Sequence, residues 1–205
     1  MITVGTTFGV DPADTESPHP DPIALLLEWL PADADPPPLS TLSTIGLDGH
    51  PDSRHLLISH RDAEGLYFHT DTNSRKCAEL AAHPFASIAV AWPTLARQLV
   101  ARGSVEALTP DEALDAYRRR SRYLQLLAWQ NTDGVAVLPV VERHARWAEY
   151  DAAHPEEPLT PPDTWGGFRL RPTELVFWRG DPIGPSQRHR YTRTPDGWTL
   201  EVLPG

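Results

Sequence analysis

The segment from Thr70 to Leu80, TDTNSRKCAEL, places two positive side chains where a helix is expected to begin. Ser74 has the residue type of a helix N-cap, and Pro84 ends the short helical stretch that follows it. Arg75 and Lys76 then occupy the first turn, at the positive end of the helix dipole, where acidic residues are the usual choice. Because two cations beside free backbone N–H groups repel each other, the segment predicts an anion site, with phosphate as the first candidate. The alternative is a solvated surface helix that carries two harmless charges.

Three further side chains could serve such a ligand. Arg54, on a neighbouring predicted strand, would supply a third cation, although it could equally face solvent. Gln98 begins a strand directly after a turn, and its amide offers both a donor and an acceptor to the edge of a flat heterocycle. Trp178 could pack against a ring, although such tryptophans belong to the core more often. Taken one at a time, none of these residues identifies the ligand.

Two basic regions supply the candidates for acid–base or substrate-binding roles. In a predicted strand near the C-terminus, alternation puts Arg188 and Arg190 on one face and His189 on the other. His189 is a possible acid–base group, without a carboxylate partner nearby in the sequence; the alternative is a basic edge strand that guards against aggregation. Arg120, in a basic run that ends a helix, could hold an anionic substrate, although solvation of a helix end explains it as well.

Composition argues against several classes of protein. The 205 residues carry a formal net charge of −10, which disfavours a nucleic-acid binder, and the single cysteine, Cys77, excludes an internal disulfide. The histidines do not fall at zinc-ligand spacing, so we expect no metal site. No apolar run approaches the roughly 18 residues of a membrane span, and the N-terminus lacks the basic and apolar regions of a secretory signal. The sequence thus predicts a cytoplasmic protein without membrane or nucleic-acid partners.

The order of the elements that carry these residues predicts the fold class. We expect residues 1–20 to form a disordered tail and residues 21–205 to form a single domain. Expected helices cover residues 23–30, 77–82, 109–120, 121–130 and 140–153. Asp21 is the expected N-cap of the first, and Thr109 with Glu112 is expected to form a capping box at the start of the third. Expected strands cover residues 39–46, 54–59, 66–70, 86–92, 97–108, 168–171, 173–178, 188–193 and 198–203, with a bulge at Gly103. A mainly β chain with a few inserted helices predicts a small barrel with peripheral helices.

Taken in order, these pieces resemble the pyridoxamine 5'-phosphate oxidase family of FMN-binding split β-barrels, which assemble as homodimers. The likeness runs from residue 39 to residue 134 and resumes at residue 165. The segments that carry it are Gly49–Pro51, Arg54–Ile58, Gly65–Thr70, Asn73–Lys76, Trp92, Arg97–Gln98, Gly103, Glu106, Trp129, Trp165–Arg169, Phe177–Trp178, Arg188 and Tyr191. Each motif is weak alone, but their common order makes the resemblance specific.

The resemblance implies where FMN would bind, at the interface of a homodimer. The residues that would hold its phosphate are Arg54, Thr70, Arg75 and Lys76. The positions that match contacts to the flavin ring are Gln98, Trp178 and Arg188. A guanidinium near that ring would stabilise negative charge on it. The matching segments add, as further cofactor positions, His55, Leu56, Leu57, His69 and Ser74.

Departures from the family pattern concern the substrate. Five positions that the resemblance assigns to substrate binding no longer carry the family's residue: Ser59, Ala116, Leu124, Gly184 and Ser186. Of the cluster that would bind the substrate's phosphate, Arg120 remains. Each lost charged partner is worth roughly 1.5–3 kcal/mol, so we expect pyridoxamine phosphate to bind poorly. Asp133–Gly134 replaces a family pair that reaches the flavin, and that contact is therefore left open.

The expected function is an FMN-dependent oxidoreductase that acts on a small non-B6 substrate and passes electrons to oxygen, with specialised metabolism as a reasonable setting. Three alternatives stay open. A genuine pyridoxamine/pyridoxine 5'-phosphate oxidase would need His189, Arg190 or Arg120 to take over substrate binding. A non-catalytic flavin-binding protein would show no turnover. A deazaflavin could also replace FMN, since related barrels use one.

Overall fold

The computed structural model describes residues 18–32, 37–181 and 183–205 and divides the chain into two compact units. Unit 1 comprises Met1–Phe68, Arg75–Glu106 and Arg169–Gly205, and unit 2 comprises His69–Ser74 and Ala107–Phe168. The expected N-terminal tail lies outside the described residues except for residues 18–20. There, the hydroxyl of Tyr191 donates a hydrogen bond to the carbonyl of His19 (2.7 Å), which ties this point of the chain to unit 1.

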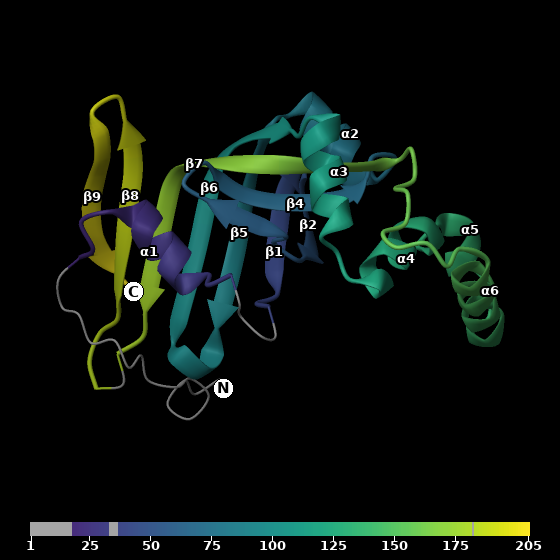
Figure 1. Cartoon of the computed structure of the whole chain (residues 1–205). Coiled ribbons are helices and arrows are strands. Elements are labelled where there is room, and N and C mark those ends of the chain that lie inside the picture. Colours follow the sequence, from purple (N-terminus) through teal and green to yellow (C-terminus); the bar gives the residue numbers. More distant parts are fainter. Residues whose placement is uncertain (1–17, 33–36, 182) are drawn as a thin grey trace. The chain divides into compact units, whose positions relative to one another are not determined.

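The strands form one sheet whose registered neighbours pair antiparallel (Figure 1). Its members are β1 (Ser40–Ile45), β2 (Pro51–Leu56), β3 (His60–Asp62), β4 (Gly65–Asp71), β5 (Phe85–Trp92), β6 (Arg97–Ala107), β7 (Trp165–Arg179), β8 (Gln187–Thr194) and β9 (Gly197–Pro204). The order across the sheet is β2-β1-β5-β6-β7-β4-β3, and β8 pairs with both β7 and β9. The mainly β class expected from the sequence is therefore confirmed.

Two of the helices begin at the caps that the sequence predicts. Unit 1 contains α1 (Pro22–Trp29), α2 (Arg75–Ala82) and the 3₁₀ turn η2 (Pro93–Leu95); unit 2 contains α3 (Pro110–Arg118), α4 (Arg122–Gln130), α5 (Asp133–Ala136) and α6 (Val140–Ala153). Asp21 caps α1 by accepting hydrogen bonds from two backbone N–H groups. Thr109 and Glu112 form the expected capping box at α3.

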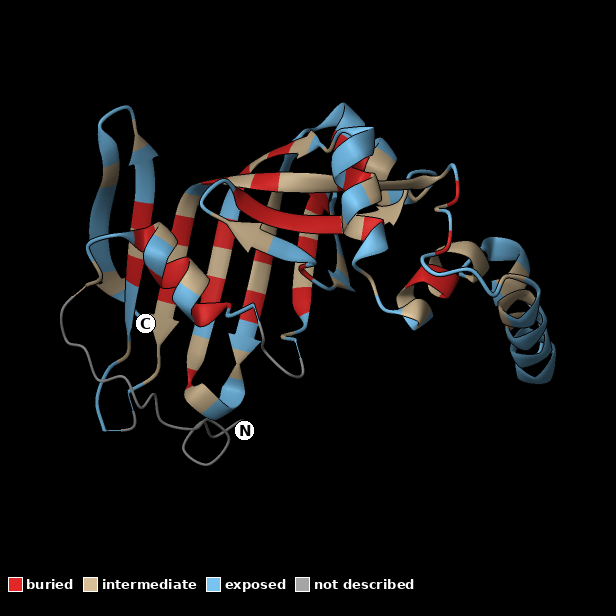
Figure 2. Ribbon diagram, viewed as in Figure 1, coloured by how far each residue is buried: buried red, intermediate tan, exposed pale blue. Residues whose placement is uncertain are grey.

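Each unit has its own apolar core (Figure 2). In unit 1, β6 shows the alternation of a strand with one buried face, and Leu99 and Ala101 on that face are completely buried. In unit 2, Tyr117, Leu126 and Leu159 form the buried cluster, with Trp129 and Trp165 among the side chains packed against it. Because alternate residues of β6 are buried in this core, the residues between them lie on the opposite face of the strand.

The structure corrects two expectations about the long strands. Gly103 does not form a bulge in the β5–β6 pairing, because the register runs without a break from Phe85–Ser104 to Trp92–Arg97. Glycine is required there for another reason: a Cβ atom at Gly103 would lie 1.8 Å from the carbonyl oxygen of Arg171. The two strands expected over 168–171 and 173–178 are one continuous strand, β7, which runs through the buried Pro172.

Smaller differences concern short elements. Strand β3 and helix α5 carry no strong periodic signal and were not expected from the sequence. Strand β2 begins and ends earlier than expected, at Pro51 and Leu56. Among the described residues, no helix is long and apolar enough to span a membrane.

Candidate functional site

Three elements of unit 1 bring Arg54 against a buried carboxylate. Arg54 lies in β2, and Glu79 lies in α2 with no exposed surface. The Nη2 atom of Arg54 donates to Oε2 of Glu79 at 2.7 Å. The hydroxyl of Thr44 in β1 donates to the same oxygen at 2.7 Å and accepts a hydrogen bond from Nη1 of Arg54. The carboxylate is therefore paired and hydrogen-bonded, as a buried charge must be.

Arg75 opens α2 and reaches the same carboxylate from one turn away. Its Nε atom donates to Oε1 of Glu79 at 2.8 Å and lies 3.2 Å from Oδ2 of Asp52. Asp52 also lies 3.1 Å from Nη2 of Arg54. Within the described residues Arg75 makes no further side-chain hydrogen bond, and its side chain is 65% exposed. A guanidinium held at Nε with both terminal Nη groups available suits bidentate binding of an anion.

The electrostatics of this cluster favour the charged forms of Glu79 and Arg75. Burial alone would raise the pKa of Glu79, but hydrogen bonds from Thr44, Arg75 and Arg54 outweigh it and lower the pKa to about 2. The pKa of Arg75 is raised, first by its hydrogen bond to Glu79 and then by Asp52. Two guanidinium groups and two carboxylates cancel in formal charge, so the cluster needs no bound anion to balance it.

The other residues predicted for the phosphate adjoin this cluster along the chain. Lys76 follows Arg75 in the first turn of α2, and Ser74 directly precedes that helix, as expected of an N-cap position. In unit 2, the hydroxyl oxygens of Thr70 and Ser74 lie 3.3 Å apart. His69 stacks on Trp165 with the ring planes 3° from parallel and the centroids 5.1 Å apart.

The residues carried by β2 divide between two faces. Arg54 and Leu56 lie on one face of the strand, and His55 points to the other. There, Nδ1 of His55 lies 3.1 Å from the hydroxyl of Thr41 in β1. Leu57 follows the strand and is exposed. The structure thus brings Arg54 together with Arg75, and it separates His55 from both.

Three residues predicted to contact the ring lie on the non-core face of neighbouring strands. Trp178 in β7 and Arg188 in β8 are direct cross-strand partners. Their sequence neighbours Phe177 and His189, also partners, face the core. Gln98 is the second residue of β6, the strand beside β7, and is exposed where the next residue is buried. The sheet therefore presents an amide, an indole and a guanidinium on one side.

His189 is buried, with 8% of its surface exposed. Burial lowers its pKa, and the nearby positive charge of Arg179 lowers it further, so the ring is neutral near pH 7. It lies on the core face of β8 with Tyr191. The alternation predicted for this strand is confirmed, and the acid–base role of His189 stays a prediction.

Arg120 in unit 2 is a half-buried cation. Its guanidinium lies over the ring of Trp165, 4.6 Å from the ring centre, and makes no ion pair within the described residues. Burial lowers its pKa. The neighbouring Arg122, by contrast, is neutralised by Asp151 at 2.6 Å. Arg120 also lines an open hollow of about 280 Å³ with Arg118, Arg122, Gln125, Glu157 and Pro158.

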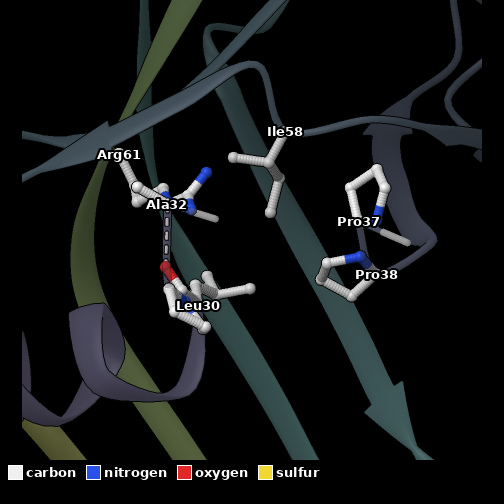
Figure 3. A pocket seen from close by; sticks show the side chains of 7 residues that line it. Leu30, Ala32, Pro37, Pro38, Ile58 and Arg61 are labelled. Atoms are coloured by element: carbon white, nitrogen blue, oxygen red, sulfur yellow. Dashed lines mark hydrogen bonds between the residues drawn. The ribbon is translucent and has the colours of Figure 1, made fainter. Parts of the chain in front are cut away.

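A second hollow, in unit 1, is too small for a ligand (Figure 3). It measures about 30 Å³ and is lined by Leu30, Pro31, Ala32, Pro37, Pro38, Ile58 and Arg61. The Nε atom of Arg61 donates to the carbonyl of Leu30 at 2.7 Å. That volume corresponds to about one water molecule. Over the described parts of the chain, no group of three or more His, Cys, Asp or Glu side chains is arranged to hold a metal ion.

Comparison with known proteins identifies the family. Residues 32–163 match the family model described as pyridoxamine 5'-phosphate oxidase. The chain belongs to the pyridoxamine 5'-phosphate oxidase family. Residues 165–204 match a second model, the C-terminal dimerisation region of pyridoxine 5'-phosphate oxidase. The resemblance inferred from the ordered motifs is thereby confirmed.

Relatives within this family cover nearly the whole chain. A pyridoxine/pyridoxamine 5'-phosphate oxidase of Caulobacter vibrioides is 37% identical over 190 residues, covering 89% of this chain and 84% of the relative. One of Myxococcus xanthus is 34% identical over 188 residues, covering 90% and 91%. The crystal structure of PhzG from Burkholderia lata 383, in complex with tetrahydrophenazine-1-carboxylic acid, superimposes with a TM-score of 0.82 at 27% identity, covering 97% of this chain and 100% of that one. An FMN-binding protein of Nostoc punctiforme has the same fold, with a TM-score of 0.68 at 19% identity. The split-barrel fold expected from the sequence is confirmed.

The residues that sequence reasoning missed are the partners of the arginines. Glu79 follows Arg75 by four residues, a spacing at which helical side chains meet, and Asp52 precedes Arg54 by two residues on the same face of a strand. Both spacings were readable from the sequence. Thr44 was not predictable in this way, because its contact depends on the β1–β2 register.

Proposed function

We propose that the protein is an FMN-dependent oxidase that forms a homodimer and acts on a small cyclic substrate other than a B6 vitamer, with oxygen as the electron acceptor. The observation that carries the cofactor assignment is the pair Arg54 and Arg75, both held by Glu79 and with the Nη groups of Arg75 available. The assignment to an oxidoreductase is supported by the match to the pyridoxamine 5'-phosphate oxidase family. The substrate assignment depends on the residues that differ from the family pattern.

The residues present fit FMN. Arg75 and Lys76 at the start of α2, together with Arg54 from β2, offer three cations, which suits a phosphate dianion. Gln98, Trp178 and Arg188 offer the hydrogen-bonding and stacking groups that a flavin ring requires. When bound, FMN supplies the redox chemistry by accepting a hydride equivalent from the substrate. The chain's own contribution is to bind the phosphate, orient the ring and place positive charge near it.

A homodimer is supported by the match of residues 165–204 to a dimerisation region. These residues include β8 and β9, where Leu200 and Val202 are exposed apolar side chains. Tyr123 in α4 is also exposed, and it opens the largely apolar segment Tyr123–Trp129, which would suit an interface. Contact with a second copy would remove these side chains from water.

The substrate assignment is supported by the residue types found at the predicted substrate positions. Ala116 and Leu124 offer no polar group, and the hydroxyl of Ser59 donates to the carbonyl of Tyr67 at 3.0 Å. Arg120 retains its charge without a carboxylate partner in the described part of unit 2. One guanidinium suits a monoanion such as a carboxylate better than a phosphate dianion that needs several partners. PhzG, whose structure contains a cyclic carboxylic acid, is a relative consistent with this substrate class.

A genuine pyridoxine or pyridoxamine 5'-phosphate oxidase is the second candidate. It is supported by relatives of that name at 34–37% identity over most of the chain. In that case Arg120 and Arg190 would have to replace the lost substrate contacts. Arg190 is already paired with Glu201, which makes it a poor substitute.

Anaerobic reduction of the bound flavin separates the two candidates. The protein loaded with FMN is mixed, without oxygen, with pyridoxamine phosphate, pyridoxine phosphate or tetrahydrophenazine-1-carboxylic acid, and the visible absorbance is followed. The proposal predicts rapid bleaching by a cyclic carboxylate and a rate at least about 100-fold slower with both B6 phosphates, equivalent to about 2.7 kcal/mol. Bleaching by pyridoxamine phosphate with release of hydrogen peroxide after air is admitted would establish the second candidate instead.

A further inference from the structure

The buried carboxylate of Glu79 is an unexpected group so close to a proposed phosphate site. A carboxylate and a phosphate dianion repel each other, so an acidic residue at this point reduces the positive potential offered to the ligand. It is nonetheless fully buried, and its oxygens accept hydrogen bonds from Thr44, Arg54 and Arg75. A benefit to the site must therefore offset the repulsion between this carboxylate and the phosphate.

We infer that Glu79 is the positioning residue of the phosphate site and aligns the guanidinium groups of Arg54 and Arg75 for the incoming dianion. This inference rests on the proposed function. Oε2 holds Arg54 and Oε1 holds Arg75, so a single carboxylate fixes side chains from a strand and from a helix. Its contact with Arg75 is at Nε, which leaves the terminal Nη groups of that side chain for a ligand.

The energetic reason is preorganisation. Two long side chains with like charge would separate in the free protein, and a ligand would then have to order both of them. Glu79 and Asp52 cancel the two positive charges in formal terms, so the arginines can be ordered when the chain folds. The entropy lost in ordering the two arginine side chains is then lost during folding, so it does not reduce the affinity for the cofactor.

Asp52 cannot take over this role. It touches the same two arginines, but its side chain is 31% exposed, and solvent screens its charge. The contacts of Glu79 include the Thr44 hydroxyl, which itself accepts a hydrogen bond from Arg54. Glu79 is therefore the member of the cluster whose position is fixed by the fold.

The decisive variant is Glu79→Asp, which keeps the charge and shortens the side chain by one methylene group. A shorter carboxylate cannot hold Arg54 and Arg75 at once. Affinities of the apoprotein for FMN and for riboflavin, which lacks the phosphate, are measured by quenching of flavin fluorescence. We expect FMN to bind at least about tenfold more weakly and riboflavin to change by less than about twofold, because the lost alignment concerns the phosphate alone.

The matched control is Glu174→Asp, since Glu174 also pairs with an arginine of unit 1, Arg102 at 3.1 Å. It should leave both affinities unchanged. An unchanged FMN affinity in Glu79→Asp would overturn the inference. A parallel loss of affinity for FMN and riboflavin would also overturn it, because it would mean a general structural role.

If Glu79→Asp does not fold, Thr44→Val removes one of the hydrogen bonds to Glu79, and the same selective loss of FMN affinity, about threefold, is expected. A wild-type protein that binds no FMN would contradict the proposed function itself, whereas normal wild-type binding with no effect of either variant contradicts the inference alone.

Discussion

Glu79 and Arg54 form an ion pair, with Oε2 and Nη2 2.7 Å apart, in which the carboxylate is completely buried. The pair links α2 to β2, and Arg75 joins it from the first turn of the same helix. Arg75, one of the two cations at the start of α2, is thus anchored by an acid four residues further along the chain, and the same acid holds Arg54. Under the proposed function, stability and cofactor binding would therefore depend on the same side chains.

Acid should destabilise the protein through Glu79. The pKa of Glu79 is lowered from 4.5 to about 2 in the folded state, so its contribution to stability is fully present above about pH 4.5 and is lost as the pH falls toward 2. At 1.36 kcal/mol per pKa unit, the upper limit is roughly 3 kcal/mol. Denaturant unfolding of the wild type and of Glu79→Gln, compared between about pH 7 and pH 3, should give converging stabilities at low pH. Curves that stay parallel would contradict this assignment.

Removing the cations at the start of α2 should release the cofactor. Arg75→Ala combined with Lys76→Ala removes charge-assisted contacts worth roughly 1.5–3 kcal/mol each, so we expect FMN to bind at least about 100-fold more weakly. The variant should purify with little visible absorbance and unfold at a lower temperature than the loaded wild type, because a bound ligand stabilises the fold. Arg102→Ala, at another arginine of unit 1 with an exposed side chain, is the control. A double variant with a full complement of FMN would rule out these residues as the phosphate site.

Gly103→Ala should destabilise unit 1. The added Cβ atom would lie 1.8 Å from the carbonyl oxygen of Arg171, which forces β6 and β7 apart, at a cost of about 2–4 kcal/mol. Gly134→Ala in α5 is the matched control, because nothing lies within 4 Å of its Cβ position. That variant should be neutral or slightly more stable, since alanine favours a helix. Equal unfolding free energies for the two variants would show that the close approach is not rigid.

Arg120→Ala should weaken binding of the substrate and leave binding of the cofactor unchanged. The guanidinium of Arg120 has no carboxylate partner within the described residues. An anionic substrate would therefore interact with a positive charge that no other side chain neutralises. Loss of one charged contact predicts a rise in KM of roughly 10- to 100-fold for whichever anionic substrate bleaches the flavin. Arg119→Ala, at the exposed neighbouring residue, should change neither quantity. An unchanged KM in Arg120→Ala would exclude this residue from the substrate site.

The sequence predicted the elements whose signals are local. The N-cap at Asp21 and the capping box of Thr109 and Glu112 lie next to the helices they start, and both were found as expected. Pro172 was misleading, because a proline normally interrupts a strand, and here the surrounding sheet keeps β7 continuous.

Part of the site could be predicted in the same way. Arg54 and Arg75 were chosen for their charge and position, and the structure brings them to one carboxylate. Glu79 was missed because an acidic residue in a helix normally faces solvent, and its burial follows from packing of α2 against β1. Contacts that depend on such packing are not encoded in any short motif.

The most direct test of the central claim is a titration of the purified apoprotein with FMN and, in parallel, with riboflavin. The account predicts saturable binding of FMN at one equivalent per chain and a visible flavin spectrum. It also predicts at least about 100-fold weaker binding of riboflavin, because the phosphate contributes charge-assisted hydrogen bonds. A protein that stays colourless with FMN, or that binds riboflavin equally well, would contradict the account.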